Sequence, residues 1–506
     1  MIDHRVLKRA AITLPLVFFP SVSAAQTSAV PPARSVPQGD LEALVRAQAA
    51  KIEGLETRLR LLETASSQGS AAAVATTPIT APPQGIQPPP AVLASSQSAE
   101  TDQTTAKPSG RTYRFAHADA APPAADPSKT AVKFVNGLPR IASADGKVWF
   151  RPRGRLFFDG SATDGSDQGR DISGTSLSSV RLGFEGAVSK MSWALEGDFA
   201  RNRVVWKSAF VTFRHSLLGL DAETSLGNRF NDRTMDGSAG VGAAQFRNFN
   251  AVAGQILPQR GYWGVGVQER VYGSNWHASL QATGEDPNNI GDNNDSFTIL
   301  SRAHWNPVKS EAATLHLGAW GFREGLPAGA TGVVRNASIA GDFNTLVRVL
   351  PGTPGAVRSD VGYGLELALV AGRFWTQNEW GRRVLYRDAG NLSHSAYSID
   401  VGAFLFGGRP PYDARRGVWG RTVVDRPVLE GGPGAVSLQA RYENIDYSNL
   451  PLGGRGQALT LGANWYLSSI ARIMLDVTNW DLDNRAGTTP GKDDGHTLNA
   501  RFQLQF

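Results

Sequence analysis

The sequence of 506 residues contains no cysteine and no long apolar run. The absence of Cys excludes disulfide scaffolds, thiol catalysis and zinc sites with Cys ligands. The longest mainly apolar stretch, residues 10–20, is too short for a membrane-spanning helix, which needs about 20 residues. Lysine is also scarce, with 10 Lys against 41 Arg. Because Arg stays charged when partly desolvated and binds oxyanions with a fork of N–H groups, this bias weakly favours anionic partners.

The N-terminus has the composition of an export signal. Three basic side chains precede the apolar run at residues 10–19, and small residues follow it. This order is typical of a secretory signal peptide, to which we assign residues 1–25. Pro15 within the run and Pro20 directly after it disfavour the alternative, the first helix of a folded domain. Residues 26–39 are then a spacer, and we expect the mature protein outside the cytoplasm.

Residues 40–64 carry a heptad pattern. The a and d positions are Leu41, Val45, Gln48, Ile52, Leu55, Leu59 and Leu62. Lys51 and Arg58 fall at g positions. The following e positions hold Glu56 and Glu63, so both pairs between chains have opposite charge. The pattern predicts a coiled-coil helix that makes the chain an oligomer. A lone amphipathic helix lying on another surface is the alternative, since so short a segment is not stable alone.

A change of composition separates the next two regions. Residues 65–146 are rich in Ala, Ser, Thr, Gln and Pro, with too few apolar side chains to offset the entropy of ordering. We interpret them as a disordered linker. Residues 147–506 are instead rich in aromatics, Gly and short alternating runs. They form the body of the protein.

Strict alternation of apolar and polar residues dominates residues 147–506. At the C-terminus, one face of the predicted strand carries Leu498, Ala500, Phe502, Leu504 and Phe506, and the other carries Asn499, Arg501, Gln503 and Gln505. Strand side chains alternate with period two. A strand with one apolar face and one polar face is typical of a transmembrane β-barrel. We therefore predict an all-β fold, an antiparallel transmembrane barrel. If one strand and its loop take about 22 residues, residues 147–506 provide about 16 strands. A soluble β-sandwich or propeller is the alternative.

A row of arginines begins this region. Arg151, Arg153 and Arg155 alternate with apolar residues, so they share the predicted inner face, about 6.6 Å apart. Rows of Arg are one means by which anion pores select. Alternatively, these arginines pair with Glu185, Glu196 and Asp198 on neighbouring strands and stiffen the wall. Both interpretations stand for Arg151 and Arg153.

Several segments resemble one family of outer-membrane proteins. They are Gly154–Asp159, Ser179–Gly186, Leu405–Asp413, Gly434–Tyr442 and Leu461–Leu467. Their order and spacing are similar to those of the phosphate-selective porin O/P family. The resemblance implies a 16-stranded trimeric porin with loops folded into the lumen, passing phosphate or related anions. The chain departs from the family pattern at Gly408 and Phe246, where the family has Glu.

The resemblance adds candidate residues for selectivity. It falls on Arg155 and Arg181, which favours a functional role for these two. Arg247 follows a Gly-rich stretch, residues 236–244, that can fold inward as a constriction loop. Arg323 and Arg335 lie in and near the loop after Trp320. The predicted anion-binding residues are therefore Arg151, Arg153, Arg155, Arg181, Arg247, Arg323 and Arg335.

We accordingly expect a Gram-negative outer-membrane porin with a periplasmic N-terminal segment, working by passive diffusion of small anions. The expected partners are outer-membrane lipid, a homotrimer of the same chain and, through the coiled coil, the cell wall. We expect no catalytic residue, cofactor, metal or nucleic acid, since the eight His show no paired-ligand spacing. A hydrolase with a Ser/His pair remains open, because such partners need only meet in space.

Two further functions are alternatives. One is a general or sugar-selective porin, whose mark is a row of lumen aromatics that Phe157, Trp375 and Trp480 could join. The other is an envelope-tethering protein, in which residues 40–128 grip the cell wall and the barrel is only an anchor.

Overall fold

The computed structural model describes residues 130–135, 138–200, 203–284, 286–288 and 296–506. The predicted signal peptide, spacer, coiled coil and most of the linker lie outside these residues. The longer strands are β3 (Val148–Asp164), β4 (Ser173–Val188), β5 (Met191–Asp198), β6 (Val205–Leu217), β7 (Leu220–Phe230), β8 (Trp263–Tyr272), β9 (Trp276–Thr283), β10 (Phe297–Lys309), β11 (Ala313–Gly325), β14 (Ser359–Ala371), β15 (Phe374–Tyr386), β16 (Leu392–Phe406), β19 (Ala435–Asp446), β20 (Arg455–Tyr466), β21 (Ala471–Asn484) and β22 (Gly491–Gln505). The shorter elements are β1 (Thr130–Val135), β2 (Leu138–Ser143), α2 (Met235–Ala239), α3 (Ala251–Gln255), β12 (Ala337–Ser338), β13 (Arg348–Val349), β17 (Tyr412–Asp413), β18 (Val418–Trp419) and η2 (Val428–Glu430).

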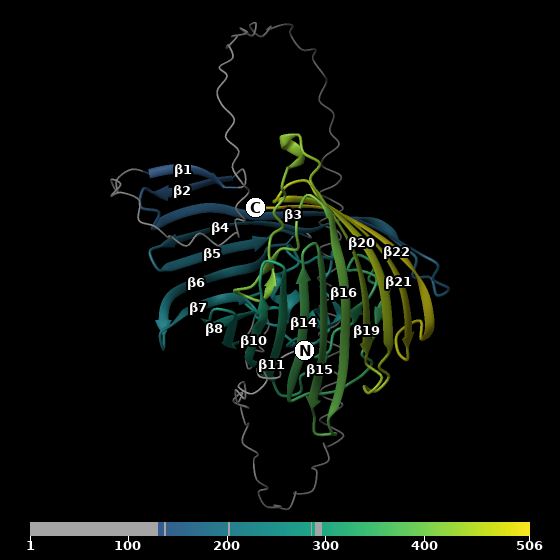
Figure 1. Cartoon of the computed structure of the whole chain (residues 1–506). Coiled ribbons are helices and arrows are strands. Elements are labelled where there is room, and N and C mark those ends of the chain that lie inside the picture. Colours follow the sequence, from purple (N-terminus) through teal and green to yellow (C-terminus); the bar gives the residue numbers. More distant parts are fainter. Residues whose placement is uncertain (1–129, 136–137, 201–202, 285, 289–295) are drawn as a thin grey trace, which may run out of the picture. The chain divides into compact units, whose positions relative to one another are not determined.

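The sixteen longer strands form one closed antiparallel barrel. Each pairs with its neighbour in the sequence, and β22 pairs with β3 from His496 opposite Asp164 to Gln505 opposite Arg155. Closure leaves no free edge, which is what a sheet inside a bilayer requires. The predicted all-β fold with about 16 strands is confirmed. Figure 1 shows the sheet curving from β3 to β22.

Residues 130–135 and 138–143, within the range predicted to be linker, form two antiparallel strands. β1 pairs with β2, and β2 joins β3 through Ile141 opposite Phe150 and Ala142 opposite Trp149. β1 and β2 therefore extend the sheet beside the start of β3 (Figure 1). Among the described residues, no helix has the length and apolar character needed to cross a bilayer.

Alternation separates the two faces of the wall. On β20, Leu459 and Leu461 are 43% and 54% exposed, whereas Thr460 and Asn464 between and beside them are buried. The exposed face is apolar because it meets lipid, and the buried face carries the polar side chains of the lumen. The C-terminal strand has the same arrangement, with Leu498 exposed and Asn499 and Arg501 buried.

The aromatic pairs at strand ends divide between the two faces. Phe374 and Trp465 are exposed on the outer surface, as an interfacial girdle requires. Their neighbours Trp375 and Tyr466 are buried inside, because adjacent residues of a strand point in opposite directions. Only one member of each pair can therefore contribute to a girdle.

The connections differ at the two ends of the barrel. At the end where β3 begins and β22 finishes, which we call the turn end, most connections have two to four residues. The exception is the 407–434 segment between β16 and β19. The opposite end, the loop end, has longer connections, including 231–262 between β7 and β8 and 326–358 between β11 and β14.

The hydrophobic core lies inside the barrel. Its buried residues come from both long loops and from the wall, and include Val252, Ile256, Val333, Val347, Trp320, Ile445 and Leu482. The wall residues of this cluster belong to β10, β11, β15, β16 and β19 to β21. One side of the lumen is therefore packed with loops.

The two faces should differ in their tolerance of charge. We expect Leu461→Arg, in the middle of the outer face of β20, to destabilise the barrel by about 2–4 kcal/mol, and Gln457→Arg, nearer the loop end of the same face, by about 0–1 kcal/mol. Urea-dependent folding into phospholipid vesicles measures both values. Equal effects at the two positions would contradict the assignment of the outer face to lipid.

Candidate functional site

The 231–262 loop crosses the lumen and is anchored on the far wall. Glu379 on β15 accepts hydrogen bonds from the backbone N–H groups of Met235 (2.7 Å) and Asp236 (3.0 Å), at the start of α2. Glu443 on β19 accepts one from the backbone N–H of Ala251 (2.9 Å), the first residue of α3. The Gly-rich stretch 236–244 thus folds inward, and we call 231–262 the constriction loop.

A third carboxyl within the constriction loop joins its two helices. Asp236 Oδ2 accepts a hydrogen bond from the backbone N–H of Asn250 (2.7 Å) and lies 3.6 Å from Arg441. Burial raises the pKa of Asp236 to about 6, an effect that Arg441 opposes and the nearby Asp400 increases. The loop is therefore internally braced as well as tied to the wall.

Four buried arginines of the wall hold the lumen segments in one recurring way. Each pairs with a wall carboxylate and also donates to a backbone carbonyl of a lumen segment. Arg501 pairs with Asp159 and donates to Arg247 O (2.8 Å), Arg441 pairs with Asp400 and donates to Asn248 O (3.0 Å), Arg383 pairs with Asp360 and donates to Val333 O (3.1 Å), and Arg302 pairs with Glu366 and donates to Gly417 O (2.6 Å). We call these residues the arginine clamps. The forked geometry of the guanidinium allows both contacts at once.

Arg247, one of the predicted anion-binding residues, belongs to the same construction. It is buried, with Nη1 3.3 Å from Asp159 Oδ2 and Nη2 donating to Asn499 (2.9 Å). Asp159 therefore lies between Arg247 and Arg501. The side chain of Arg247 ties the constriction loop to the wall.

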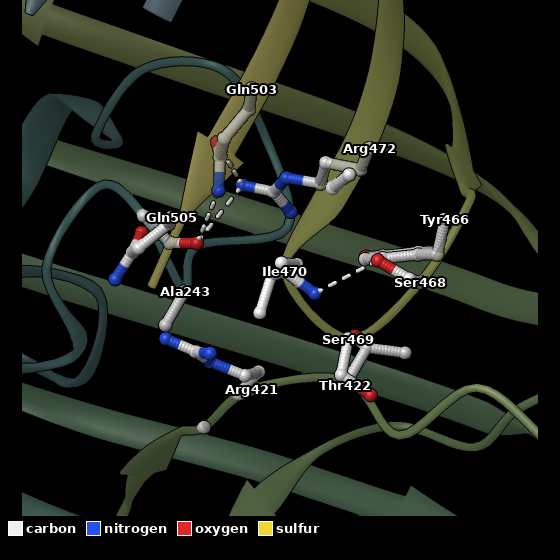
Figure 2. A pocket seen from close by; sticks show the side chains of 13 residues that line it. Ala243, Arg421, Thr422, Tyr466, Ser468, Ser469, Ile470, Arg472, Gln503 and Gln505 are labelled. Carbon is white, nitrogen blue, oxygen red and sulfur yellow. Dashed lines mark hydrogen bonds between the residues drawn. The ribbon is translucent and has the colours of Figure 1, made fainter. Parts of the chain in front are cut away.

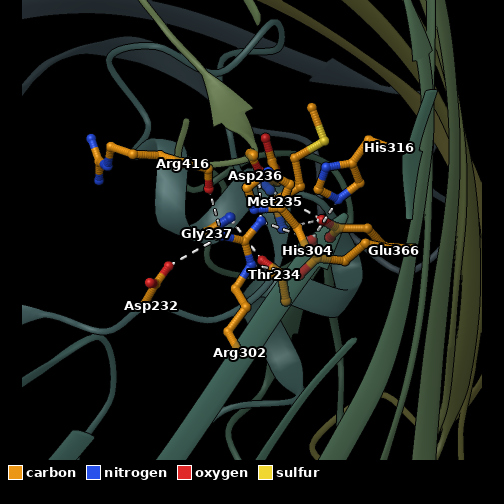
Figure 3. A network of polar contacts seen from close by, with 12 residues as sticks. Asp232, Thr234, Met235, Asp236, Gly237, Arg302, His304, His316, Glu366 and Arg416 are labelled. Carbon is orange, nitrogen blue, oxygen red and sulfur yellow. Dashed lines mark hydrogen bonds and ion pairs between the residues drawn. The ribbon is translucent and has the colours of Figure 1, made fainter. Parts of the chain in front are cut away.

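The 407–434 segment enters the lumen from the turn end. Figure 3 shows the polar network that holds it, in which Arg302 donates to the carbonyls of Arg416 and Gly417. His304 Nε2 donates to the carbonyl of Ala414 (3.1 Å). The Tyr412 hydroxyl accepts a hydrogen bond from Asn306 (2.8 Å) and lies 2.8 Å from His316 Nδ1. Histidines of β10 and β11 therefore serve to position this segment.

The opposite wall, formed by β3 to β7, keeps half-buried charges. The Arg151 guanidinium pairs with Glu185, and Arg153 lies 3.0 Å from Glu185 and 2.9 Å from Glu196. Arg181 lies 3.1 Å from Asp198. The pairing that the sequence left open for Arg151 and Arg153 is present, and it extends to Arg181.

Three further cations on this wall form no ion pair with a carboxylate of the described chain. Arg155 donates to Ser179 (2.8 Å) and stacks 4.5 Å from the Phe157 ring. Arg229 donates to Thr212 (3.1 Å) and stacks 4.8 Å from the Phe210 ring. Lys207 lies within electrostatic range of the cations Arg181 and Arg155 and of the carboxylates Asp198 and Asp286. We call Arg155, Lys207 and Arg229 the uncompensated cations.

Sequence reasoning missed two of these cations. Simple alternation places Lys207 on the outer face with Ala209 and Val211. The register of β5 and β6 shifts between Glu196 and Gly197, so that Lys207 has no partner of its own. This β-bulge redirects Lys207 to the inner face. Arg229 follows the alternation of β7, and that parity was the signal that could have found it.

Two candidates lie outside the wall formed by β3 to β7. Arg323 is exposed on the outer face of β11, between the buried Phe322 and Glu324. Its prediction as a lumen residue is wrong, because the odd positions of that strand face outward. Arg335 lies in the 326–358 loop and donates to the carbonyl of Gln259 (2.6 Å). It joins the two loops that enter from the loop end.

Comparison with known families agrees with this architecture. Residues 257–506 match the family model described as phosphate-selective porin O and P. These residues belong to that family. Family and closed barrel together identify an outer-membrane porin.

Individual relatives are more distant. An uncharacterized protein of Caulobacter vibrioides is 28% identical over 418 residues, which cover 77% of this chain and 80% of the relative. An anion-selective porin from Comamonas acidovorans is 13% identical, with 71% of this chain and 100% of that chain covered and a TM-score of 0.45. OmpT of Vibrio cholerae, solved in a trimer form, is 11% identical, with 71% and 99% covered and a TM-score of 0.44.

The three lumen aromatics Phe157, Trp375 and Trp480 do not form one row. Phe157 lies between Arg155 and Arg501, at 4.5 and 4.4 Å from their guanidinium carbons. Trp375 packs with residues of the constriction loop and of the 407–434 segment, and Trp480 belongs to the main core. All three are buried in separate contacts. They offer no aromatic track along which a sugar ring could slide.

Removing the anchor of α2 should loosen the constriction. In Glu379→Ala, two backbone N–H groups and the Asn250 amide lose their acceptor, and each such hydrogen bond contributes about 0.5–1.5 kcal/mol. We expect larger and noisier single-channel currents in planar bilayers. Asp388→Ala, which removes an exposed loop carboxylate, is the control. Identical traces for Glu379→Ala and the wild type would show that Glu379 does not set the constriction.

Proposed function

We propose that this porin passes small anions, phosphate among them, by passive diffusion along the wall formed by β3 to β7. The constriction loop, the 326–358 loop and the 407–434 segment pack mainly against the remaining wall. They reach β3 near its loop end, at Asp159 and Thr163, and the rest of the wall formed by β3 to β7 is the side that we assign to water and solute. The uncompensated cations carry the proposal, since they are half-buried on this wall and no carboxylate of the described residues forms an ion pair with them.

The chemistry of these cations suits passage rather than tight capture. Arg155 and Arg229 are held by hydroxyl groups and aromatic rings, so their charge stays available to a passing anion. Each can exchange a hydroxyl partner for an oxyanion without leaving a buried carboxylate unpaired. Conduction needs sites that are favourable enough to enter and weak enough to leave.

Arg151, Arg153 and Arg181 have a different role in this proposal. Their charges are largely offset by Glu185, Glu196 and Asp198. They stiffen the wall and shape the local field, and contribute less to the net attraction of anions. We therefore propose a preference for small anions in general, with phosphate as one member of the class.

We propose a channel without catalytic activity. Three histidines that an enzyme could use, His277, His304 and His316, are buried and hydrogen-bonded to Asp232, to the 407–434 segment and to Glu366. Their contacts support a structural role on the packed side of the lumen.

Neutralising the uncompensated cations tests the proposal. We expect Arg155→Gln, Lys207→Gln and Arg229→Gln together to lower the anion-to-cation permeability ratio at least about fivefold, because each charge at close range contributes on the order of 1 kcal/mol even in water. Reversal potentials in a KCl gradient measure the ratio.

The matched control removes three exposed cations outside the lumen, by Arg358→Gln, Arg455→Gln and Lys492→Gln. It should leave the reversal potential unchanged. A wild-type channel that prefers cations, or equal shifts in the two triple variants, would refute selection by Arg155, Lys207 and Arg229.

We further propose that the chain works as a homotrimer whose N-terminal segment is periplasmic and contacts the cell wall. The heptad pattern of residues 40–64 and the trimer form of OmpT of Vibrio cholerae support this arrangement. Short turns at the end where β3 begins are typical of the periplasmic side.

Deleting residues 40–128 separates this role from conduction. We expect the deletion to abolish co-sedimentation with peptidoglycan while single-channel conductance stays within experimental error of the full chain. Loss of conductance would place part of the pathway in the deleted region, and retained sedimentation would contradict wall contact through it.

A further inference from the structure

Two arginines point away from the lumen, on the lipid-facing side of the wall. Arg323 lies on β11 and Arg382 on β15, and both side chains are exposed. β14 runs between these strands, with Val361 opposite Arg323 and Tyr363 opposite Arg382. At a strand spacing of about 4.8 Å and an offset of two residues, the two arginine Cα atoms are about 12 Å apart. Both long side chains can therefore reach one ligand that lies over β14.

The protein does not neutralise either of these charges. Among the described residues, the Arg323 guanidinium forms no hydrogen bond or ion pair, and the Arg382 guanidinium donates only to the Ser393 hydroxyl (2.8 Å). In the loop that joins β15 to β16, Asp388 pairs with Arg358 instead (3.1 Å). The acidic residues of β11, β14, β15 and β16 are all buried on the inner face, namely Glu324, Asp360, Glu366, Glu379 and Asp400. The outer face of these four strands therefore carries two arginines and no carboxylate.

Several arginines that face inward are instead held by protein groups. Figure 2 shows one of them, Arg472 on β21, which donates to the Gln503 side chain (3.0 Å) and to the carbonyl of Ala244 (2.9 Å). Arg383, the residue after Arg382, is an arginine clamp with partners on the wall and in the lumen. The contrast within this Arg-Arg pair follows from strand alternation. Only the outward arginine keeps its guanidinium available to a ligand from outside the protein.

The position of the two arginines along the wall corresponds to the headgroup region of a bilayer. The rings of Tyr363 and Trp380 lie 5.9 Å apart on the outer face, and such aromatic residues mark the edge of the apolar band. Leu365 continues that band toward the middle of the wall. Arg382 is level with Tyr363, and Arg323 is two residues nearer to the loop end. An arginine at this level costs little compared with one at the middle of the bilayer.

The charge of the outer face is different on other strands at the loop end. Asp481 on β21 and Asp494 on β22 are both exposed and lie directly opposite each other. Arg455 on β20 is also exposed, but it has a carboxylate partner, Asp483, at 3.5 Å. An anionic lipid headgroup is therefore attracted to the side formed by β11, β14 and β15 rather than to β20–β22.

We propose that Arg323 and Arg382 form a binding site for the phosphate of an outer-leaflet lipid on the outer surface of the barrel. The connections at the loop end are long, as is typical of the extracellular side, so the site faces the outer leaflet. Guanidinium groups bind phosphate through forked hydrogen bonds, and two of them can share one headgroup. The site lies outside the lumen and does not depend on the proposed passage of anions.

Native mass spectrometry can measure this binding on the full-length porin, delipidated in a neutral detergent and mixed with diphosphoryl lipid A. We expect the double variant Arg323→Gln/Arg382→Gln to raise the dissociation constant at least about tenfold, because two charge-assisted contacts are lost. Arg455→Gln is the matched control, since it removes an exposed arginine of the outer face that already has a carboxylate partner. It should leave the dissociation constant unchanged.

Two further measurements keep the proposal testable if the double variant fails to assemble. The single variant Arg323→Gln removes a guanidinium without a protein partner, and it should weaken binding about threefold or more. Lipid A without its phosphates should bind the wild type at least about tenfold more weakly than the diphosphoryl form. Equal affinity of the wild type and an assembled variant, or of the two lipids for the wild type, would overturn the site. The reversal potential in KCl reports the proposed anion preference separately.

Discussion

Inside a bilayer, every backbone N–H and C=O must find its hydrogen-bond partner within the protein. This requirement governs the structure. Sixteen strands meet it by closing, with β22 paired to β3. Closure in turn fixes which side chains face lipid, since a strand cannot turn over without losing its ladder. The apolar outer face of β20 and the buried polar face beneath it both follow from this constraint.

A barrel of this width would leave a wide lumen, and the chain narrows it with its own segments. The arginine clamps explain how irregular backbone can lie there. A loop inside the lumen brings carbonyl groups that need donors, and Arg302, Arg383, Arg441 and Arg501 supply them while each keeps a wall carboxylate. The preference for Arg over Lys thus serves the architecture, because a point-like ammonium cannot make both contacts with fixed geometry.

Local pattern predicts the wall far better than the lumen. The alternation at Leu498 to Phe506 and around Leu461 predicts the correct face for each residue, because period two is a property of the strand itself. Lys207 does not follow this alternation because it lies at a β-bulge. The bulge arises from the pairing register of β5 and β6, which the pattern of one strand alone does not contain. For Arg323 the error came from treating a strand position as part of a loop.

Partners across the lumen were the least accessible to sequence reasoning. The contacts of Arg247 with Asp159 and Asn499 join positions 88 and 252 residues apart. Similarly, the burial of Trp375 against two inserted segments follows from loops whose course has no periodic signal. The neutralisation of Arg181 by Asp198 depends on the register of β4 and β5, which no local pattern reveals.

The pairing of Arg501 with Asp159 has a consequence for biogenesis. These residues face each other across the seam between the last and first strands, and the same pair receives Arg247 of the constriction loop. This attachment point comes into existence only when the cylinder has sealed. The barrel must therefore close before the pore is fully narrowed. A barrel whose first and last strands have not yet paired lacks one attachment point of its constriction loop.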